Sequence, residues 1–182
     1  QLWVNNTSFS GPGTFALSNG SSPALSADGQ VLYLGDGDGN VAALDTATGI
    51  DNWGGAEQVT GRIRGHFAVG PNDNVHFTST DRRVFAFQDN GTSATELGNF
   101  QVTSNFSRQS PTVNASNQVF FTSGGGIVYA LDGTNPGSWG NSTNLNGVHW
   151  SKSMGSSSQS TPTLNASGDV AYVGDNNGRL FA

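Results

Sequence analysis

The residues best placed for metal chemistry lie in the segment GDGDGN at positions 35–40. Asp36, Asp38 and Asn40 occupy alternate positions, as oxygen ligands do in calcium-binding loops, and Asp45 could complete the set. An EF-hand loop ends on a bidentate glutamate, however, and no such glutamate follows here. A turn that carries acidic residues is the simpler interpretation, so we predict no metal and keep these residues only as the candidate set.

Catalytic side chains are few and far apart in the sequence. His66, His76 and His149 each lack a neighbouring partner that would make a triad or a metal pair. Neither a GxSxG motif nor a phosphate-binding glycine loop is present, and the triple glycine at 124–126 occupies a turn. The sequence therefore predicts no enzyme activity and no cofactor.

Asparagine sequons offer a different kind of modification chemistry. Asn-x-Ser/Thr triplets mark possible sites of N-glycosylation, which requires a surface position on a secreted chain. Because the chain is rich in Asn, Ser and Thr, some of these triplets are expected by chance. The candidate sites are Asn5, Asn6, Asn19, Asn90, Asn105, Asn114, Asn141 and Asn165.

Trp139 is the one aromatic residue that we expect outside the strands. It lies in the insertion 133–147, which is rich in Pro, Gly, Asn and Ser and reads as a surface loop. An exposed Trp on a loop can stack on sugars or anchor a partner, which makes Trp139 the binding candidate. The alternative is that its ring folds back onto its own loop.

The composition excludes several functional classes. The chain has 182 residues and a net charge of −6, and its seven Lys and Arg residues are scattered along the sequence. Nucleic acid and anionic membranes are therefore poor partners. Cysteine is absent, and no apolar run approaches the ~20 residues needed to span a bilayer, so we expect no membrane insertion. The chain opens at Gln1, which indicates a processed or excised product.

The elements that must position these residues come from an internal repeat. Four stretches align, and their shared column holds Pro23, Phe67, Pro111 and Pro162. We place the repeats at 21–53, 65–100, 109–150 and 160–182 within a single domain, 1–182.

Each copy predicts short strands separated by turns. In the first copy the apolar and β-branched runs 23–26, 31–34 and 41–44 are the first three strands, and Trp53 marks a fourth. The last copy ends at Ala182, before its fourth strand. The opening residues 1–4, with Trp3, match that missing strand, as in propellers that close on themselves.

The sequence therefore predicts an all-β chain, a β-propeller of four four-stranded blades whose N-terminal strand completes the last blade. The alternative is that the chain is half of a larger, eight-bladed propeller. Large flat side chains at the strand ends suit the space between blades. We assign this blade-packing role to Trp3, Trp53, Phe100 and Trp150.

The first copy, SPALSADGQVLYLGDGDGNVAALDTATGIDNW, resembles the repeat of the pyrroloquinoline-quinone-type (quinoprotein alcohol dehydrogenase-like) β-propellers. The shared pattern is Ser-Pro, an Asp-Gly turn, a Val-Tyr-Val-Gly-like strand, a Tyr-Ala-Leu-Asp strand, Thr-Gly and Trp. The third copy keeps Ser110, Pro111 and Trp150, whereas the second has Phe67 in place of proline. Enzymes of that family hold their quinone with paired cysteines and calcium. The chain lacks cysteine, so the resemblance implies the fold without that cofactor.

These observations predict a non-enzymatic, extracellular or cell-surface β-propeller glycoprotein that acts as a structural or interaction module. Unpaired strand edges invite assembly with other protein chains or with copies of the chain itself. Two alternatives stay open. One is a fragment or remnant of a quinone-dependent dehydrogenase, and the other is a carbohydrate-binding propeller that holds glycans between its blades.

Overall fold

The computed structural model describes residues 21–182, which form four antiparallel sheets that follow one another along the chain. The first sheet contains β1 (Ala24–Leu25), β2 (Val31–Gly35), β3 (Asn40–Asp45) and β4 (Glu57–Gln58). The second contains β5 (Ala68–Val69), β6 (Asn74–Ser79), β7 (Arg83–Asp89) and β8 (Ala94–Gln101). The third contains β9 (Thr112–Val113), β10 (Gln118–Thr122), β11 (Ile127–Asp132) and β12 (Val148–Ser153). The fourth contains β13 (Thr163–Leu164), β14 (Ala171–Gly174) and β15 (Leu180–Phe181).

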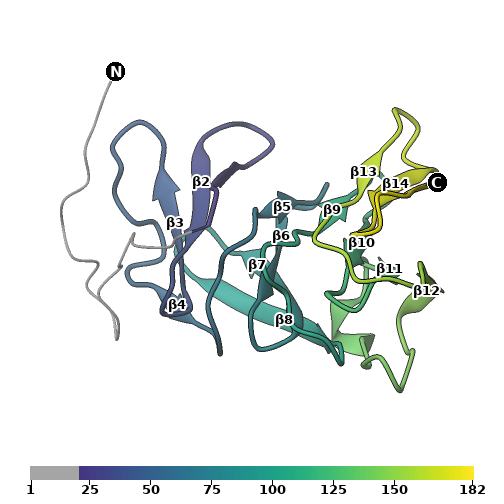
Figure 1. Cartoon of the computed structure of the whole chain (residues 1–182). Coiled ribbons are helices and arrows are strands. Elements are labelled where there is room, and N and C mark those ends of the chain that lie inside the picture. The colour runs from purple at the N-terminus through teal and green to yellow at the C-terminus, as the bar shows by residue number, and fades with distance from the viewer. Residues whose placement is uncertain (1–20) are drawn as a thin grey trace.

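In each sheet the strands are hydrogen-bonded in chain order, and the sheets lie side by side in one row (Figure 1). The first strands of successive sheets are neighbours, because residues just before them bond from sheet to sheet. Ser22 forms a parallel bridge with His66, and the backbone N–H of His66 donates to Ser110 Oγ at 2.6 Å. The backbone N–H of Ser110 in turn donates to Thr161 Oγ1 at 3.1 Å. These residues precede the aligned Pro23, Phe67, Pro111 and Pro162, so the repeat column marks the seam that joins the sheets.

The core lies between the sheets because strand side chains alternate between two faces. Tyr33 and Val41 of the first sheet are buried in one cluster with Phe77 and Phe85 of the second. The first sheet therefore points these side chains at the next sheet, and we call this its forward face.

The same arrangement recurs at the next two boundaries. Val84 of the second sheet is buried in one cluster with Phe121 and Tyr129 of the third. Val128 of the third sheet is buried with Val173 of the fourth. Each forward face thus meets the backward face of the sheet that follows.

Strand register identifies the equivalent positions in the four copies. Tyr33 pairs with Ala24 on the first strand of its sheet, and His76 pairs in the same way with Ala68. The matching first-strand pairs in the third and fourth sheets are formed by Phe120 and by Tyr172. Tyr33, His76, Phe120 and Tyr172 are therefore the same forward-facing position.

The turns of the second sheet keep their backbone geometry although other residues replace the turn glycines of the first sheet. Gly29 and Gly39 take positive φ values of 73° and 89° in the two hairpin turns of the first sheet. At the equivalent turns of the second sheet, Asp73 and Arg82 take φ values of 55° and 75°. Non-glycine residues pay a conformational cost at such angles, but Asp is among those that tolerate them best. The turn geometry is thus kept although the glycines are not.

The predicted all-β fold of four-stranded sheets is confirmed, with corrections of detail. The fourth strand of the first sheet is Glu57–Gln58, and Trp53 lies in the turn before it. The insertion 133–147 contains a short 3-10 helix, η1 (Pro136–Ser138), where no helix was expected. The expected closing strand 1–4, with Trp3, lies outside the described residues. The repeat boundaries stay predictions. No helix in the described part of the chain is long and apolar enough to cross a membrane.

Candidate functional site

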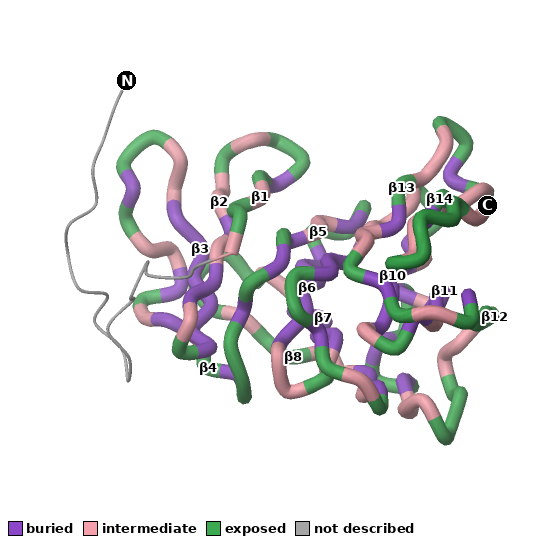
Figure 2. Tube along the Cα trace, in the orientation of Figure 1, coloured by how far each residue is buried: buried purple, intermediate pink, exposed green. Residues whose placement is uncertain are grey.

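The fourth sheet carries an open forward face. Tyr172 is 42% exposed, whereas Tyr33, His76 and Phe120 at the same position are all buried against the following sheet. Figure 2 shows the same change along the chain, from buried segments in the middle sheets to exposed colour at the C-terminal end.

A second position on the same face behaves in the same way. Leu180 lies opposite Gly174 in register, as Val41 does opposite Gly35 in the first sheet. Val41 and its equivalents, Val84 and Val128, are buried, but Leu180 is 74% exposed. We call Tyr172 and Leu180 together the open face.

The backward face of the fourth sheet is packed, which holds the open face in place. Val173 is 2% exposed and contacts the third sheet through a cluster with Val128 and Met154. Arg179 reinforces this contact, because its guanidinium donates to the carbonyl oxygen of Met154 at 2.8 Å and to the carboxylate of Asp175. The fourth sheet thus packs against the third sheet on its backward face and exposes its forward face.

A pocket of about 310 Å³ lies between the third and fourth sheets. Its walls are residues 112–115 and 164–168, which are the first strands of these sheets and the turns that follow. The side-chain amide of Asn114 donates to the carbonyl oxygen of Gly168 at 3.0 Å and ties the two turns together. The lining combines apolar side chains such as Val113 and Leu164 with hydroxyl and amide groups, which suits a small ligand that has both polar and apolar parts.

The candidate calcium loop forms a closed turn. Asp36 Oδ1 accepts from the backbone N–H groups of Asp38 and Asn40, both at 2.9 Å, and Asp36 Oδ2 accepts from Asn40 Nδ2 at 2.9 Å. The Asp36 carboxylate therefore organises its own hairpin. No group of three or more His, Cys, Asp or Glu side chains in residues 21–182 is arranged to hold a metal ion.

The quinone cofactor of the resembled enzymes does not fit this chain. Its paired-cysteine ring needs a residue type that the sequence lacks. The calcium ion that accompanies it needs several oxygen ligands, and the one acidic turn that could supply them uses its carboxylate internally, as described above. We derive no chemistry through a quinone.

The sequons fall in contrasting environments. Asn90 and Asn105 are exposed in loops, where an attached glycan would stand clear of the sheets. Asn114 and Asn165 lie at the pocket and use their side-chain amides in two hydrogen bonds each. Asn141 is half-buried, and its Oδ1 accepts from the backbone and hydroxyl of Thr143 in a turn. Asn5, Asn6 and Asn19 lie outside the described residues.

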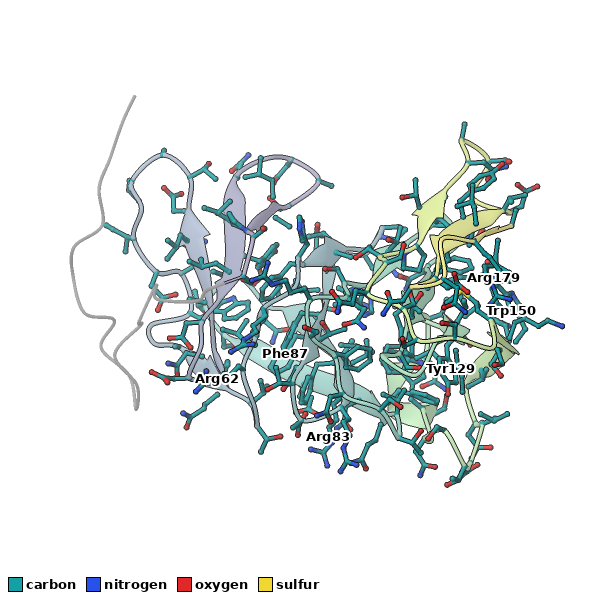
Figure 3. All side chains as sticks on the ribbon, viewed as in Figure 1. Arg62, Arg83, Phe87, Tyr129, Trp150 and Arg179 are labelled. Atoms are coloured by element: carbon teal, nitrogen blue, oxygen red, sulfur yellow. The ribbon has the colours of Figure 1, made fainter. Side chains whose placement is uncertain are left out.

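The Trp residues also divide. Trp53 is buried between the first and second sheets, where its indole N–H donates to Asp89 Oδ1 at 2.9 Å. Trp150 is instead 43% exposed on β12, with its ring centroid 6.1 Å from that of Phe120 in the same sheet. Figure 3 shows Trp150 at the edge of the molecule. Trp150 lies opposite Ala130 and therefore on the forward face of the third sheet, but β12 is an outer strand with five of its six residues exposed, so its packing between blades stays a prediction.

Trp139, the binding candidate, departs from the expected exposed ring. It is only 8% exposed, and its indole N–H donates to the carbonyl oxygen of Asp132 at 2.6 Å. It belongs to the cluster between the second and third sheets, which also contains Phe100. The loop therefore folds back and supplies Trp139 as core, which was the alternative expectation.

His76 is the most unusual titratable side chain in the described region. It is fully buried on the forward face of the second sheet, with its ring centroid 6.0 Å from that of Trp139. Neither ring nitrogen has a hydrogen-bond partner among the described residues. Burial lowers the pKa of His76 from 6.5 to about 4, so the ring is neutral at pH 7.

The open face was missed by reasoning from the sequence. Tyr172 and Leu180 look like ordinary strand residues, because the equivalent residues in the other repeats are buried in the core. The available signal was positional. They are the forward-facing residues of the fourth copy, whose sheet is the last one that the structure describes.

Comparisons with known proteins agree with this architecture. The sequence profile of the family described as outer membrane protein assembly factor BamB matches residues 1–135. Among solved structures, the crystal structure of BamB from Moraxella catarrhalis is similar, with a TM-score of 0.68 and 16% sequence identity. The match covers 88% of this chain and 44% of that one, so the chain spans less than half the length of its structural relative. At this identity the likeness shows the fold alone. The comparison with curated proteins finds no match.

Proposed function

The chain belongs to the family of the outer membrane protein assembly factor BamB, and we propose that this propeller of quinoprotein-type repeats is a non-enzymatic protein-interaction module. The observation that carries the proposal is the open face. Its residues occupy positions that bury against a neighbouring sheet everywhere else in the described chain. A protein surface with the shape of a propeller sheet is the partner that such a face fits.

We propose that this partner is a second copy of the chain. A second copy contains sheets built on the same repeat. One of its sheet faces could therefore cover Tyr172 and Leu180 as the neighbouring sheet covers the equivalent residues within the chain. The length relation supports the idea, because one chain spans 44% of the BamB structure and two would approach its full length. Burying Tyr172 and Leu180 would contribute about 2 kcal/mol each, which favours association.

Light scattering with in-line size exclusion tests the proposal. We expect wild-type particles of twice the 18.8 kDa chain mass. The double variant Tyr172→Asp, Leu180→Asp should be monomeric, since each aspartate would lose its hydration in the interface. Leu145→Asp is the matched control, because Leu145 is also an exposed apolar side chain, at 50%, but lies in the loop before β12. A monomeric wild type, or a control that dissociates equally, would overturn self-association.

We further propose that the module is extracellular and N-glycosylated. The exposed sequons Asn90 and Asn105 support this, because an attached glycan there would displace no core contact. Intact mass of the natively produced protein, measured before and after glycosidase treatment, checks it. An unchanged mass would reject both the modification and the secretion argument that depends on it.

A second candidate function is carbohydrate binding, which the pocket between the third and fourth sheets favours. A volume of about 310 Å³ is the size of a small ligand site, and its lining includes hydroxyl and amide side chains beside apolar ones, as sugars require. A glycan array tests it, with a Gly168→Val variant that narrows the pocket. Binding that is lost in this variant would support a lectin, and an array without any signal would exclude it.

A further inference from the structure

The arginines are scattered in the sequence but gather at one end of the folded chain. Five of the six lie either in the turn between the second and third strands of a sheet or in a linker that joins two sheets, and Arg83 is the first residue of β7, directly after such a turn. In a chain-ordered antiparallel sheet these two kinds of segment emerge at the same end. The six are Arg62, Arg64, Arg82, Arg83, Arg108 and Arg179.

The opposite end of the sheets is acidic. Seven aspartates lie there, in the turns between first and second strands, at the last residue of third strands or in the segment that follows a third strand. These are Asp28, Asp45, Asp51, Asp73, Asp89, Asp132 and Asp169. No arginine or lysine lies in those segments, so the chain is strongly polarised in spite of its low charge content.

Hydrogen bonds bring five of the arginines to the end of the second sheet. The linker residue Arg62 exchanges hydrogen bonds with Thr80, because its N–H donates to Thr80 Oγ1 and its carbonyl accepts from the Thr80 N–H, both at 2.9 Å. Arg82 follows two residues later in that turn. On the other side, Thr78 Oγ1 donates to the carbonyl oxygen of Gln109 at 2.5 Å and places Arg108 beside the same strand end.

The two linkers also touch one another. A Cβ atom added at Gly65 would lie 2.9 Å from the carbonyl oxygen of Gln109, so the linkers pass in close contact beside Arg64 and Arg108. Arg62, Arg64, Arg82, Arg83 and Arg108 therefore surround one sheet end, and we call them the arginine cluster. Figure 3 shows Arg62 and Arg83 along the same lower edge.

Most of this positive charge is uncompensated. Arg83 is paired with Asp81, the acidic residue of its own turn. Arg62, Arg64, Arg82 and Arg108 are exposed, and none of them forms an ion pair with a residue in 21–182. Asp36 and Asp38 lie on the neighbouring turn, where the carbonyl oxygen of Asp36 accepts from the N–H of Ile63 at 3.0 Å, so five arginines stand against three aspartates at this end. The cluster thus keeps a clear positive excess beside an acidic remainder of the chain.

We propose that the arginine cluster binds an acidic peptide segment of a partner protein. Arg guanidinium groups pair with carboxylates in bidentate geometry, and complementary charge gives such contacts both orientation and a fast approach. Nucleic acid fits less well. Nucleic-acid sites combine basic groups with aromatic rings that stack on bases, and none of the exposed Phe, Tyr or Trp residues in the described chain lies in the linkers or the turn of the cluster.

The inference rests on the protein-binding role proposed above. It is tested by changing the arginines, whereas self-association is tested at Tyr172 and Leu180. Fluorescence anisotropy with a labelled oligoglutamate peptide should give saturable binding that weakens as salt is added. Arg82→Glu should weaken it by about threefold to fivefold, and the triple variant Arg62→Glu, Arg82→Glu, Arg108→Glu by about tenfold or more. These side chains are exposed and form no hydrogen bond or ion pair with residues 21–182, so circular dichroism melting should match wild type.

Lys152→Glu is the matched control, since it reverses one exposed charge on β12 away from the cluster. We expect it to change the affinity by less than about twofold. An absence of saturable binding, or an equal loss in Lys152→Glu, would overturn the proposal. Tighter binding of an oligouridylate of the same length would assign the cluster to nucleic acid instead. Light scattering on the triple variant separates the two proposals, because Tyr172 and Leu180 remain intact and the dimer should persist.

Discussion

Replacing His76 by phenylalanine should stabilise the protein. His76 is fully buried, and neither of its ring nitrogens has a hydrogen-bond partner in the described region. The equivalent positions hold Tyr33, Phe120 and Tyr172, so the repeat accepts a six-membered ring there. Phenylalanine would keep the contact with Trp139 and remove the unpaired polar atoms.

The magnitude follows from the cost of burying an unpaired polar group. That cost is about 1–3 kcal/mol, so His76→Phe should raise the free energy of unfolding at pH 7 by about 2 kcal/mol. For a domain of this size each kcal/mol corresponds to about 2–4 °C in melting temperature, which gives a rise of about 4–8 °C. The larger phenyl ring must fit beside Trp139, and the aromatic neighbours at equivalent positions indicate that it can.

The pH dependence gives a separate signature. In the unfolded chain His76 takes up a proton below its ordinary pKa of 6.5, whereas burial holds the folded pKa near 4. Between these values the unfolded state binds more protons, so stability is complete above pH 6.5 and falls as the pH drops toward 4. The loss amounts to about 3 kcal/mol for a shift of this size. The variant lacks this component altogether.

Urea unfolding of both proteins at several pH values between 4 and 8 measures the difference. The carboxylates contribute equally to the stability of the two proteins and cancel. The difference in unfolding free energy between wild type and His76→Phe should therefore widen below pH 6.5. His149→Phe is the control, because His149 is exposed on β12 and should leave this difference unchanged. A constant offset across the pH range, or a variant less stable than wild type at pH 7, would refute the reasoning.

Four further substitutions have defined outcomes. Gly126→Ala should destabilise by more than about 2 kcal/mol in urea unfolding, because φ is +75° and the new Cβ would overlap the carbonyl oxygen of Ser156. Gly29→Ala, with a similar φ of +73° and open space around it, should cost only about 1 kcal/mol, and equal losses would reject the overlap. Tyr33→Phe removes a hydroxyl that donates to the second sheet at 2.7 Å and should cost about 1 kcal/mol by the same measurement. Trp139→Ala should lower stability by about 3 kcal/mol, and an unchanged melting temperature would place the ring outside the core.

The fold could be predicted from the sequence because each copy contains the same turn residues and the same apolar runs in the same order. The run 31–34 and its counterparts became the second strand of each sheet. Trp53 misled the placement of a strand, since a large aromatic residue near a strand end can serve the core from a turn. Its indole reaches the second sheet while the strand proper starts at Glu57.

The surfaces were less accessible, because exposure depends on which neighbour is present. Tyr172 occupies the same position as the buried Tyr33, and the two differ only in whether a described sheet covers them. The arginines looked isolated for a related reason. Arg62 and Arg82 are distant in sequence, and a linker and a turn must meet at one sheet end before they become neighbours.

The order of the sheets along the chain determines where unfolding should begin. Each described sheet buries its core only against its immediate neighbours, so stability is close to a sum of local terms along a line. The boundary between the third and fourth sheets has the smallest buried cluster, built on Val128, Met154 and Val173. Unfolding should therefore start as fraying from the C-terminal sheet. Amide hydrogens of β14 should exchange sooner than those of β6, in a gradient that runs along the row.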